Sequence, residues 1–199
     1  MRPTHAHALA RAGQIIAVLC FCISLSAENF SADSALFAAY QRQDMSIWKA
    51  HIDSISDLPY EYGYCGYLVE YDNSKAKPYV KRFKNHVHAR KNQLPVGHYE
   101  MYMSAVYVYE LRLHESLHPA KAMSLAKEAV RKAPNDPLVL AYYATCLFYA
   151  PKPIGSKREA LTYFEKAAQH FYGPQWQYCW VREATQMYIL QCLEKLKMH

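Results

Sequence analysis

The chain has 199 residues with a formal net charge of +6, and 52% of its residues are hydrophobic. That length suffices for one domain with a sizeable core. The positive charge is mild, so it permits an anionic partner without requiring one. Together with the export signal described next, it argues against a nucleic-acid partner.

The first 27 residues have the layout of a secretory signal peptide. Arg2 and Arg11 give a positive start, residues 15–25 are apolar apart from Ser24, and small residues precede Ala27. We therefore expect residues 1–27 to be removed, which leaves an exported chain with a net charge of +4 and no stable membrane span. The periplasm or cell envelope is the expected location. The apolar run is short for a membrane span, and an uncleaved anchor is the alternative.

Four cysteines lie beyond the signal peptide, and their spacing forms neither a CxxC pair nor a metal-binding knuckle. Cys179 and Cys192 fall on one predicted helix, about 20 Å apart, which is beyond disulfide reach. We expect all four to be small buried apolar residues: Cys65, Cys146, Cys179 and Cys192. One disulfide that includes Cys65 or Cys146 is the alternative in an oxidising compartment.

The chain after the signal peptide begins with two predicted helices. A short helix over residues 31–42 ends at a break, and a second helix follows over residues 47–56, with Ser46 as its N-cap. The second helix is expected to turn four apolar side chains inward: Ile47, Trp48, Ile52 and Ile55.

A tyrosine-rich element over residues 60–71 comes next. Gly63 and Gly66 lie three residues apart in it. Because glycine costs a helix about 1 kcal/mol, the pair indicates either a close helix contact or a poorly formed helix. A turn at residues 72–74 then leads to a basic helix over residues 76–92.

From residue 98 the pattern becomes regular. Residues 98–113 predict an amphipathic helix, residues 116–119 a turn, and the next helix carries alanines at i, i+4 and i+7: Ala122, Ala126 and Ala129. The same spacing recurs in Ala160, Phe164 and Ala167. Small residues at helical spacing form a narrow stripe that lets another helix approach closely, and Pro134 stops the first of these helices.

These two segments resemble the second helix of the tetratricopeptide repeat. With Pro134 as the closing proline, the resemblance starts the next repeat at Pro137 and assigns four residues to the packing side of its first helix: Leu140, Tyr143, Ala144 and Leu147. It also places a four-residue insertion within residues 150–156. The specific resemblance covers about residues 103–171.

The resemblance implies an all-α fold of stacked antiparallel helix pairs, forming a right-handed solenoid with a C-terminal capping helix. The expected parts are the signal peptide (1–27), divergent pairs (28–95), two recognisable pairs (96–172) and the capping helix (173–199). This order is similar to that of exported bacterial tetratricopeptide proteins, whose roles are mostly undefined. The insertion also resembles one in periplasmic repeat proteins that accompany TRAP transporters.

Residues 114–118 match HExxH, in which one helix presents both histidines to zinc and the glutamate activates the metal-bound water. Pro119 disfavours helical geometry at the second histidine, and no third-ligand signature follows. We interpret the motif as a surface turn with two solvated histidines. A zinc peptidase with His114 and His118 as ligands is a remote alternative; otherwise no metal and no cofactor are expected.

Two surfaces are candidates for binding a partner. The repeat register places five residues on a concave face formed by first helices: Tyr107, Val108, Tyr142, Thr145 and Tyr149. Aromatic rings there would hold a peptide at low entropic cost, although packing between helices is the simpler interpretation for any single tyrosine.

A basic face is the second candidate, because five residues recur at helical spacing: Lys77, Lys81, Lys84, His88 and Lys91. Such a face suits an acidic protein, an anionic glycan or a lipid headgroup, and a solvated helix face is the simpler interpretation. We predict an exported, non-enzymatic scaffold that binds a protein or peptide. A periplasmic small-ligand carrier associated with a transporter is the alternative.

Overall fold

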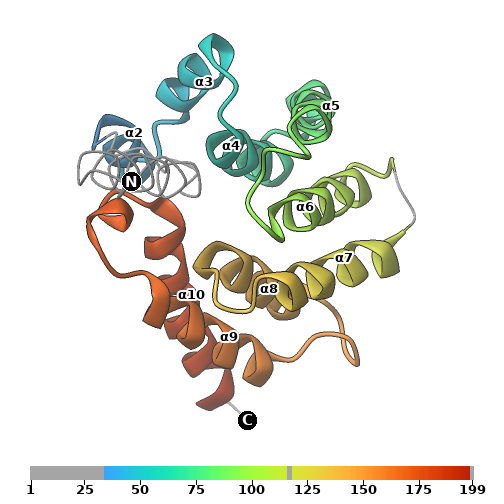
Figure 1. The fold of residues 1–199 in the computed structure, drawn as a ribbon, viewed down its shortest axis with the longest axis vertical. Helices are drawn as coiled ribbons and strands as arrows, with labels where there is room; N and C mark the ends of the chain where they lie inside the picture. The colour runs from blue at the N-terminus through green and yellow to red at the C-terminus, as the bar shows by residue number, and fades with distance from the viewer. Residues whose placement is uncertain (1–33, 116–117, 198–199) are drawn as a thin grey trace, which may run out of the picture.

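The computed structural model describes residues 34–115 and 118–197, and all regular structure in these residues is helical (Figure 1). Within them, nine α-helices pack in sequential antiparallel pairs, so the all-α prediction is confirmed. A short 3-10 helix, η1 (Pro174–Trp176), precedes the last of them. The helices are α2 (Ser34–Gln41), α3 (Met45–Ser54), α4 (Leu58–Tyr71), α5 (Asn73–Ala89), α6 (His98–Arg112), α7 (Pro119–Lys132), α8 (Pro137–Tyr149), α9 (Lys157–His170) and α10 (Trp180–Lys197).

The alanine stripes lie buried between paired helices, as the sequence predicts. Ala126 and Ala129 of α7 are inaccessible to solvent, and so are Ala160, Phe164 and Ala167 of α9. Their small side chains let α7 approach α6 and let α9 approach α8. The residues assigned to the packing side of α8 are also all buried: Leu140, Tyr143, Ala144 and Leu147.

Side-chain caps fix where the helices of the second pair begin. The carboxylate of Asp136 accepts hydrogen bonds from two backbone N–H groups in the first turn of α8, at 2.9 and 3.0 Å. Ser156 Oγ accepts the backbone N–H of Glu159 at 3.2 Å and starts α9. The loop between them contains residues 150–156, where the insertion was predicted. Each such cap is worth about 1 kcal/mol.

The predicted starts differ from the structure for α3, α4, α5 and α10; α4 begins at Leu58, and α5 begins at Asn73, inside the predicted turn at residues 72–74, and ends at Ala89. α3 begins at Met45, and its N-cap is Asp44 in place of Ser46, whose N–H lies 3.3 Å from the Asp44 carboxylate. The C-terminal helix begins at Trp180, because residues 174–176 form η1 instead. The predicted start of the first helix, residue 31, lies outside the described residues.

The buried side of α3 is narrower than predicted. Trp48 and Ile52 are buried, whereas Ile47 and Ile55 are exposed. The buried side chain of Trp48 packs against Tyr60 of α4 and Trp180 of α10, so α3 buries mainly the side that carries Trp48 and Ile52. The expectation that Ile47 and Ile55 point inward is therefore wrong.

The two glycines of α4 allow large rings to lie against its backbone. A Cβ atom at Gly63 would lie 2.6 Å from the Trp48 ring and 2.9 Å from the Trp180 ring. At Gly66 it would lie 3.1 Å from the Tyr109 hydroxyl oxygen. Since α4 is a continuous helix, the close-contact explanation of these glycines is confirmed.

The C-terminal helix contacts both ends of the helix array. α10 packs on α9, and its first residue, Trp180, also meets the rings of Tyr40 and Trp48, with centroid distances of 5.8 and 5.6 Å. Glu183 accepts a hydrogen bond from Gln41 at 3.4 Å. Figure 1 accordingly shows the chain curling round until α2 lies beside the start of α10. The predicted capping helix thus also joins the last helix pair to the first helices.

The predicted signal peptide lies outside the described residues, so export stays a prediction. None of the helices in residues 34–115 and 118–197 combines the length and apolarity that crossing a membrane requires.

Candidate functional site

Aromatic rings gather where α4, α6, α8 and α10 face one another. Tyr62 lies among them, and the centroids of four neighbouring rings are 5.7–6.2 Å from its own: Tyr102, Tyr109, Tyr142 and Trp180. We call these five residues the aromatic centre. Aromatic pairs at such distances add about 0.5–1.5 kcal/mol each beyond the effect of burial. The ring contacts therefore hold together helices that are distant in the sequence.

Two hydroxyl groups of the aromatic centre are committed to internal hydrogen bonds. Tyr142 Oη donates to Ser104 Oγ at 2.8 Å, and Ser104 Oγ donates to the Ala122 carbonyl oxygen at 2.7 Å. Tyr109 Oη donates to the Tyr62 carbonyl oxygen at 3.0 Å. Burial raises the pKa of both tyrosines well above the ordinary value, so they stay neutral and act as fixed donors.

Three of the residues predicted to line a concave face are wholly or partly buried. Tyr142 is only 6% exposed and belongs to the aromatic centre. Thr145 is half-buried, and its hydroxyl donates back to the Ala141 carbonyl oxygen at 2.9 Å. Val108 is half-buried in α6. Tyr142 in particular packs between helices, which was the simpler interpretation of that tyrosine.

The other two predicted concave-face residues have contacts in different parts of the molecule. Tyr149 is 64% exposed, and its hydroxyl lies 3.1 Å from that of Tyr188 in α10. Tyr107 lies near α5 and α7, with Lys84 Nζ 5.9 Å and Lys121 Nζ 4.7 Å from its ring centroid. The structure therefore does not bring the five residues together as one contact surface.

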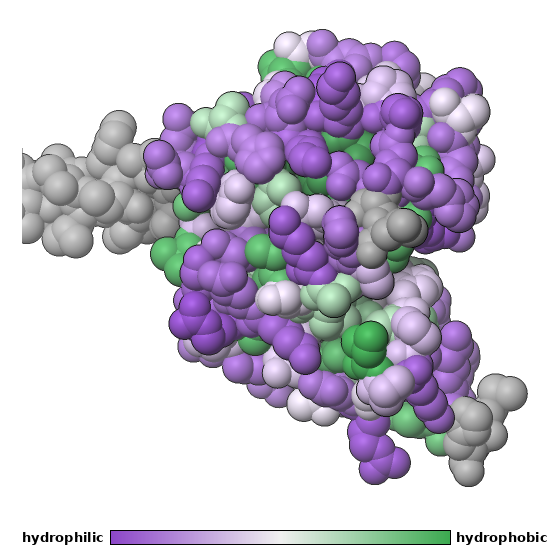
Figure 2. Space-filling model, turned by 90° about the vertical axis from the view of Figure 1, so that its right-hand side faces the viewer, coloured by the Kyte–Doolittle hydropathy of each residue, from purple (hydrophilic) through white to green (hydrophobic). Residues whose placement is uncertain are grey.

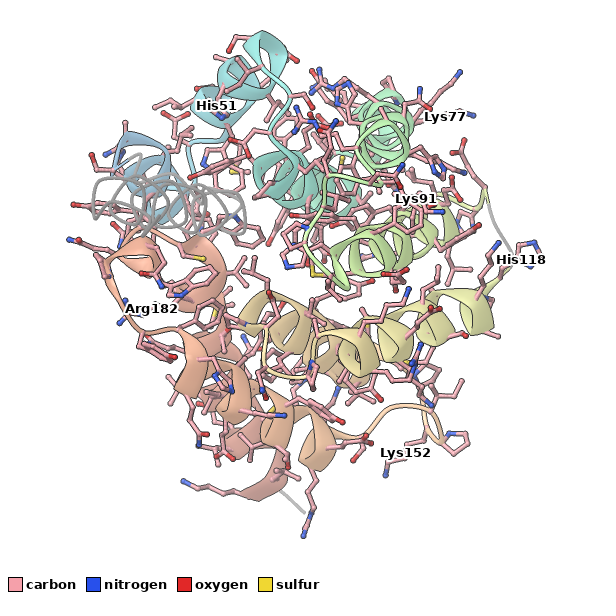
Figure 3. The ribbon with its side chains drawn as sticks, viewed as in Figure 1. His51, Lys77, Lys91, His118, Lys152 and Arg182 are labelled. Atoms are coloured by element: carbon pink, nitrogen blue, oxygen red, sulfur yellow. The ribbon has the colours of Figure 1, made fainter. Side chains whose placement is uncertain are left out.

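The basic face of α5 lies along α6 and the residues that follow it. Between residues 73 and 91 the sequence has seven lysines and arginines and no acidic residue. Carboxylates from the neighbouring segment neutralise part of this charge: Lys77 pairs with Glu115, and Lys84 pairs with Glu110 at 2.8 Å. Figure 3 shows Lys77 and Lys91 on this outer part of the molecule.

Two of the remaining residues of the face, His88 and Lys91, lie beside the ring of Tyr99. Lys91 Nζ lies 4.9 Å from the Tyr99 ring centroid, and His88 Nδ1 lies 3.1 Å from the Tyr99 hydroxyl. Lys81 and Lys121 are exposed, and neither forms an ion pair within the part of the chain that the structure describes. We name six residues of α5, α6, α7 and the loop that follows α5 the lysine–tyrosine seam: Lys81, Lys84, Lys91, Tyr99, Tyr107 and Lys121.

The HExxH residues do not share a helix. α6 ends at Arg112, α7 begins at Pro119, and His114 has a φ of 59°, in the left-handed region. His114 and His118 are exposed, and Figure 3 shows His118 at the edge of the molecule. No group of three metal-ligating side chains occurs in the described residues, which omit 116 and 117. The described part of this motif thus forms the predicted turn and lacks the helical spacing that a zinc peptidase requires.

Sequence analysis missed three histidine–carboxylate pairs. Glu61 is almost fully buried, and its two carboxylate oxygens lie 2.8 and 2.9 Å from His86 Nδ1. His98 Nε2 lies 3.0 Å from Asp136 Oδ2, which joins the start of α6 to the start of α8. The third pair is His51 with Asp57, also at 3.0 Å. The sequence carries no periodic pattern that could have predicted these pairs, because each pair joins residues of different helices or loops.

Hydrogen bonds keep Asp136, in the pair between α6 and α8, ionised although it is largely buried. Desolvation raises the pKa of Asp136, but the His98 hydrogen bond and charge and two backbone N–H groups outweigh it, so the pKa falls below its ordinary value. Asp136 therefore remains ionised, and it both caps α8 and holds His98. These contacts have a structural role and leave no carboxylate open for acid–base chemistry at this position.

The four cysteines of the described chain are free, so the disulfide alternative is not realised there. Cys65, Cys179 and Cys192 are buried. Burial raises the pKa of the Cys146 thiol to about 11 and that of Cys179 to about 12. Because the thiolate is the reactive form, these cysteines are poor nucleophiles at neutral pH.

No protein-family model, curated protein or solved structure matches the chain.

Proposed function

We propose that the chain is an exported, non-enzymatic scaffold of the tetratricopeptide type, which binds an acidic protein or peptide at the lysine–tyrosine seam. The location follows from the signal-peptide layout of residues 1–27, and the periplasm or cell envelope is the compartment it implies. The repeat assignment is supported by the buried small-residue stripes of α7 and α9.

The choice of this surface rests on one observation, the unpaired lysines. Lys81, Lys91 and Lys121 are exposed and have no carboxylate partner in the described chain, whereas Lys77 and Lys84 of the same face pair with Glu115 and Glu110. Figure 2, which looks onto the right-hand side of Figure 1, shows hydrophilic residues gathered over the upper half, where α5 lies. Unpaired cations beside half-buried tyrosine rings suit a ligand that has both carboxylates and apolar groups.

The ring positions explain why a polypeptide suits the seam better than a simple anion. Tyr99 and Tyr107 are both half-buried, and each has a lysine ammonium group within 5 Å of its ring centroid. Tyrosine is rigid and amphipathic, so it adds contact area at little entropic cost. A carboxylate would compete for the ammonium groups, while apolar side chains would cover the rings.

Fluorescence anisotropy with two labelled twelve-residue peptides tests this proposal. One peptide repeats Glu-Phe-Glu and the other repeats Lys-Phe-Lys, so they differ in charge alone. We expect binding of the acidic peptide only, and an affinity that falls as salt is raised from 50 to 300 mM because exposed charges are screened.

Charge reversal at the seam supplies the matched control. A triple variant with Lys81→Glu, Lys91→Glu and Lys121→Glu should weaken acidic-peptide binding by more than about tenfold. A second triple variant has the same change in net charge at exposed positions elsewhere: Lys127→Glu, Lys152→Glu and Arg158→Glu. Equal losses in the two variants would show that only net charge matters and would refute the seam.

Binding of a small apolar ligand at the aromatic centre is the second candidate function. It is favoured by the partial exposure of Tyr62 and Trp180, two rings that lie deep between the helices. The close ring contacts around Tyr62 favour peptide binding at the seam, because the neighbouring rings already fill the space around Tyr62 that a ligand would need. Quenching of tryptophan fluorescence by a small aromatic ligand, absent in a Trp180→Phe variant, would favour the carrier function.

A further inference from the structure

The outward side of α10 exposes an apolar stripe. Leu190 is 64% exposed, Met187 46% and Leu193 38%. At 100° per residue, Met187 and Leu193 lie about 60° to either side of Leu190, so the three side chains form one strip. The opposite side of the helix is buried through Thr185 and Cys192. The terminal helix of a repeat array normally has a polar outer side, so an apolar strip on this side indicates a surface that another molecule covers.

Charged residues of opposite sign lie at the two ends of the strip. Glu183 and Lys197 are each seven residues from Leu190, and helical geometry places both within about 20° of its direction. Neither forms an ion pair within the described part of the chain, although Glu183 is half-buried and accepts the hydrogen bond from Gln41 of α2. Leu190 therefore lies about two helical turns from Glu183 toward the start of α10 and about two turns from Lys197 toward its end.

We propose that the strip binds a second copy of this chain, with the two α10 helices antiparallel and the two-fold axis at Leu190. In that register Leu190 meets its own counterpart, and Met187 of each copy meets Leu193 of the other. Glu183 of each copy then lies opposite Lys197 of the other, and Gln186 lies opposite Glu194. One symmetric arrangement thus covers all three apolar residues and pairs both charges twice.

The geometry of packed helices is compatible with this register. Helix axes approach to about 8–10 Å, and Cα atoms lie about 2.3 Å from their axis, so facing Cα atoms at the two-fold are about 3.4–5.4 Å apart. That range overlaps the separation that a disulfide requires. The two Met187 residues would be displaced by about 9 Å along the axes, which is beyond that separation. Met187 and Leu193 of the other copy lie at one height but on opposite sides of the interface, so their Cα atoms are about 7.0–8.7 Å apart, also beyond it.

The dimer is a weak one. A strip of three partly exposed residues in each copy is small beside the roughly 1,600 Å² of a standard interface, so the dimer forms only at high chain concentration. Binding of the acidic partner does not depend on it, because the lysine–tyrosine seam lies on α5, α6, α7 and the loop that follows α5.

Cysteine cross-linking tests the register. The purified chain, with its N-terminus determined by mass spectrometry, carries Leu190→Cys, Met187→Cys or Leu193→Cys and is oxidised at 100 μM, with the wild type as baseline. We expect an efficient covalent dimer from Leu190→Cys only, and much less from Met187→Cys or Leu193→Cys, whether these two are oxidised alone or as a mixture. Cross-linking that is equal in all samples, or absent from Leu190→Cys, would overturn the proposal.

Sedimentation equilibrium tests the same dimer without cross-linking. Leu190→Glu should raise the dissociation constant by more than about tenfold, because the charge would be buried at the two-fold axis, while Val96→Glu, at another exposed apolar residue, should leave it unchanged. Glu183→Lys should weaken the dimer, and adding Lys197→Glu should restore it. A wild-type chain that stays monomeric at 200 μM, or a dimer indifferent to Leu190→Glu, would refute self-association through α10.

Discussion

Helices approach closely in two regions of this molecule, and the side chains that allow it differ. In the α6–α7 and α8–α9 pairs, small residues such as Ala126 and Ala160 let the backbones come near. Where α3, α4 and α10 meet, Gly63 lies under the large rings of Trp48 and Trp180. The pairs are formed by neighbours in sequence, whereas the junction joins the two ends of the array. Its stability therefore depends on the fit of a few large rings.

The largest effect is expected at the junction. Trp48 is buried, and its Nε1–H donates to the Leu36 carbonyl oxygen at 2.8 Å. Trp48→Ala should lower the free energy of unfolding by about 3–5 kcal/mol, because a large buried side chain is replaced by a cavity. Urea unfolding followed by circular dichroism measures this. Trp48→Phe should cost less than half as much, and a loss below 1 kcal/mol in Trp48→Ala would contradict the described packing.

Enlarging a small residue in the pairs should have a smaller effect. Ala126 is inaccessible to solvent, so Ala126→Leu forces α7 away from α6 and should cost about 1–3 kcal/mol. The neighbouring Lys127 is exposed, and Lys127→Leu should change stability by less than about 0.5 kcal/mol. Equal effects of the two substitutions in urea unfolding would mean that the stripe does not face α6.

A polar contact links the two pairs, and its effect depends on pH. The folded-state pKa of Asp136 is lowered from 3.8, so its stabilising contribution is present above pH 3.8 and is lost as the pH falls through the folded-state value. Asp136→Asn, which keeps a capping side chain, should cost about 1 kcal/mol at pH 7. The difference from wild type should shrink below pH 3.8. An unchanged difference at pH 3 would exclude the carboxylate as its source.

The rate at which cysteines are alkylated reports on packing in both regions of the unsubstituted chain. Cys65 lies in α4 near the junction, and Cys146 lies in α8 of the second pair. A pKa raised from 9.0 to about 11 lowers the thiolate fraction of Cys146 about 100-fold at pH 8. Alkylation followed by mass spectrometry should show slow labelling of both in the folded chain and rapid labelling in urea. Fast labelling of folded Cys146 would place it on an open surface.

The sequence could predict the pairs because their signal is local. Alanines at i, i+4 and i+7 before Pro134 indicate both the helix and its buried side, and Ala122, Ala126 and Ala129 are all buried. The junction could not be predicted in the same way. Glycine at position 63 showed that something approaches α4, but no periodicity shows that the approaching rings come from Trp48 and from Trp180.

The candidate site was predicted only in part, for the same reason. Four of the five residues of the basic face lie on α5 and Lys91 follows its end, while the carboxylates that pair with Lys77 and Lys84 come from Glu115 and Glu110. Tyr142 and Tyr149 lie on one helix, yet one is buried and the other exposed. Tyr142 is buried against Tyr62 of α4 and Ser104 of α6, and contacts between such distant segments leave no signal in the spacing along α8.

Hydrogen exchange in a Trp180→Ala variant tests most directly whether the aromatic junction closes the helix array. If it does, removing the ring should speed amide exchange at least about tenfold in α2, α3 and the start of α10, because local opening no longer breaks the contacts among Tyr40, Trp48 and Trp180. Protection in α7 and α9 should remain as in the wild type. Unchanged exchange in α2 and α3, or an equal loss of protection in α7 and α9, would contradict the account.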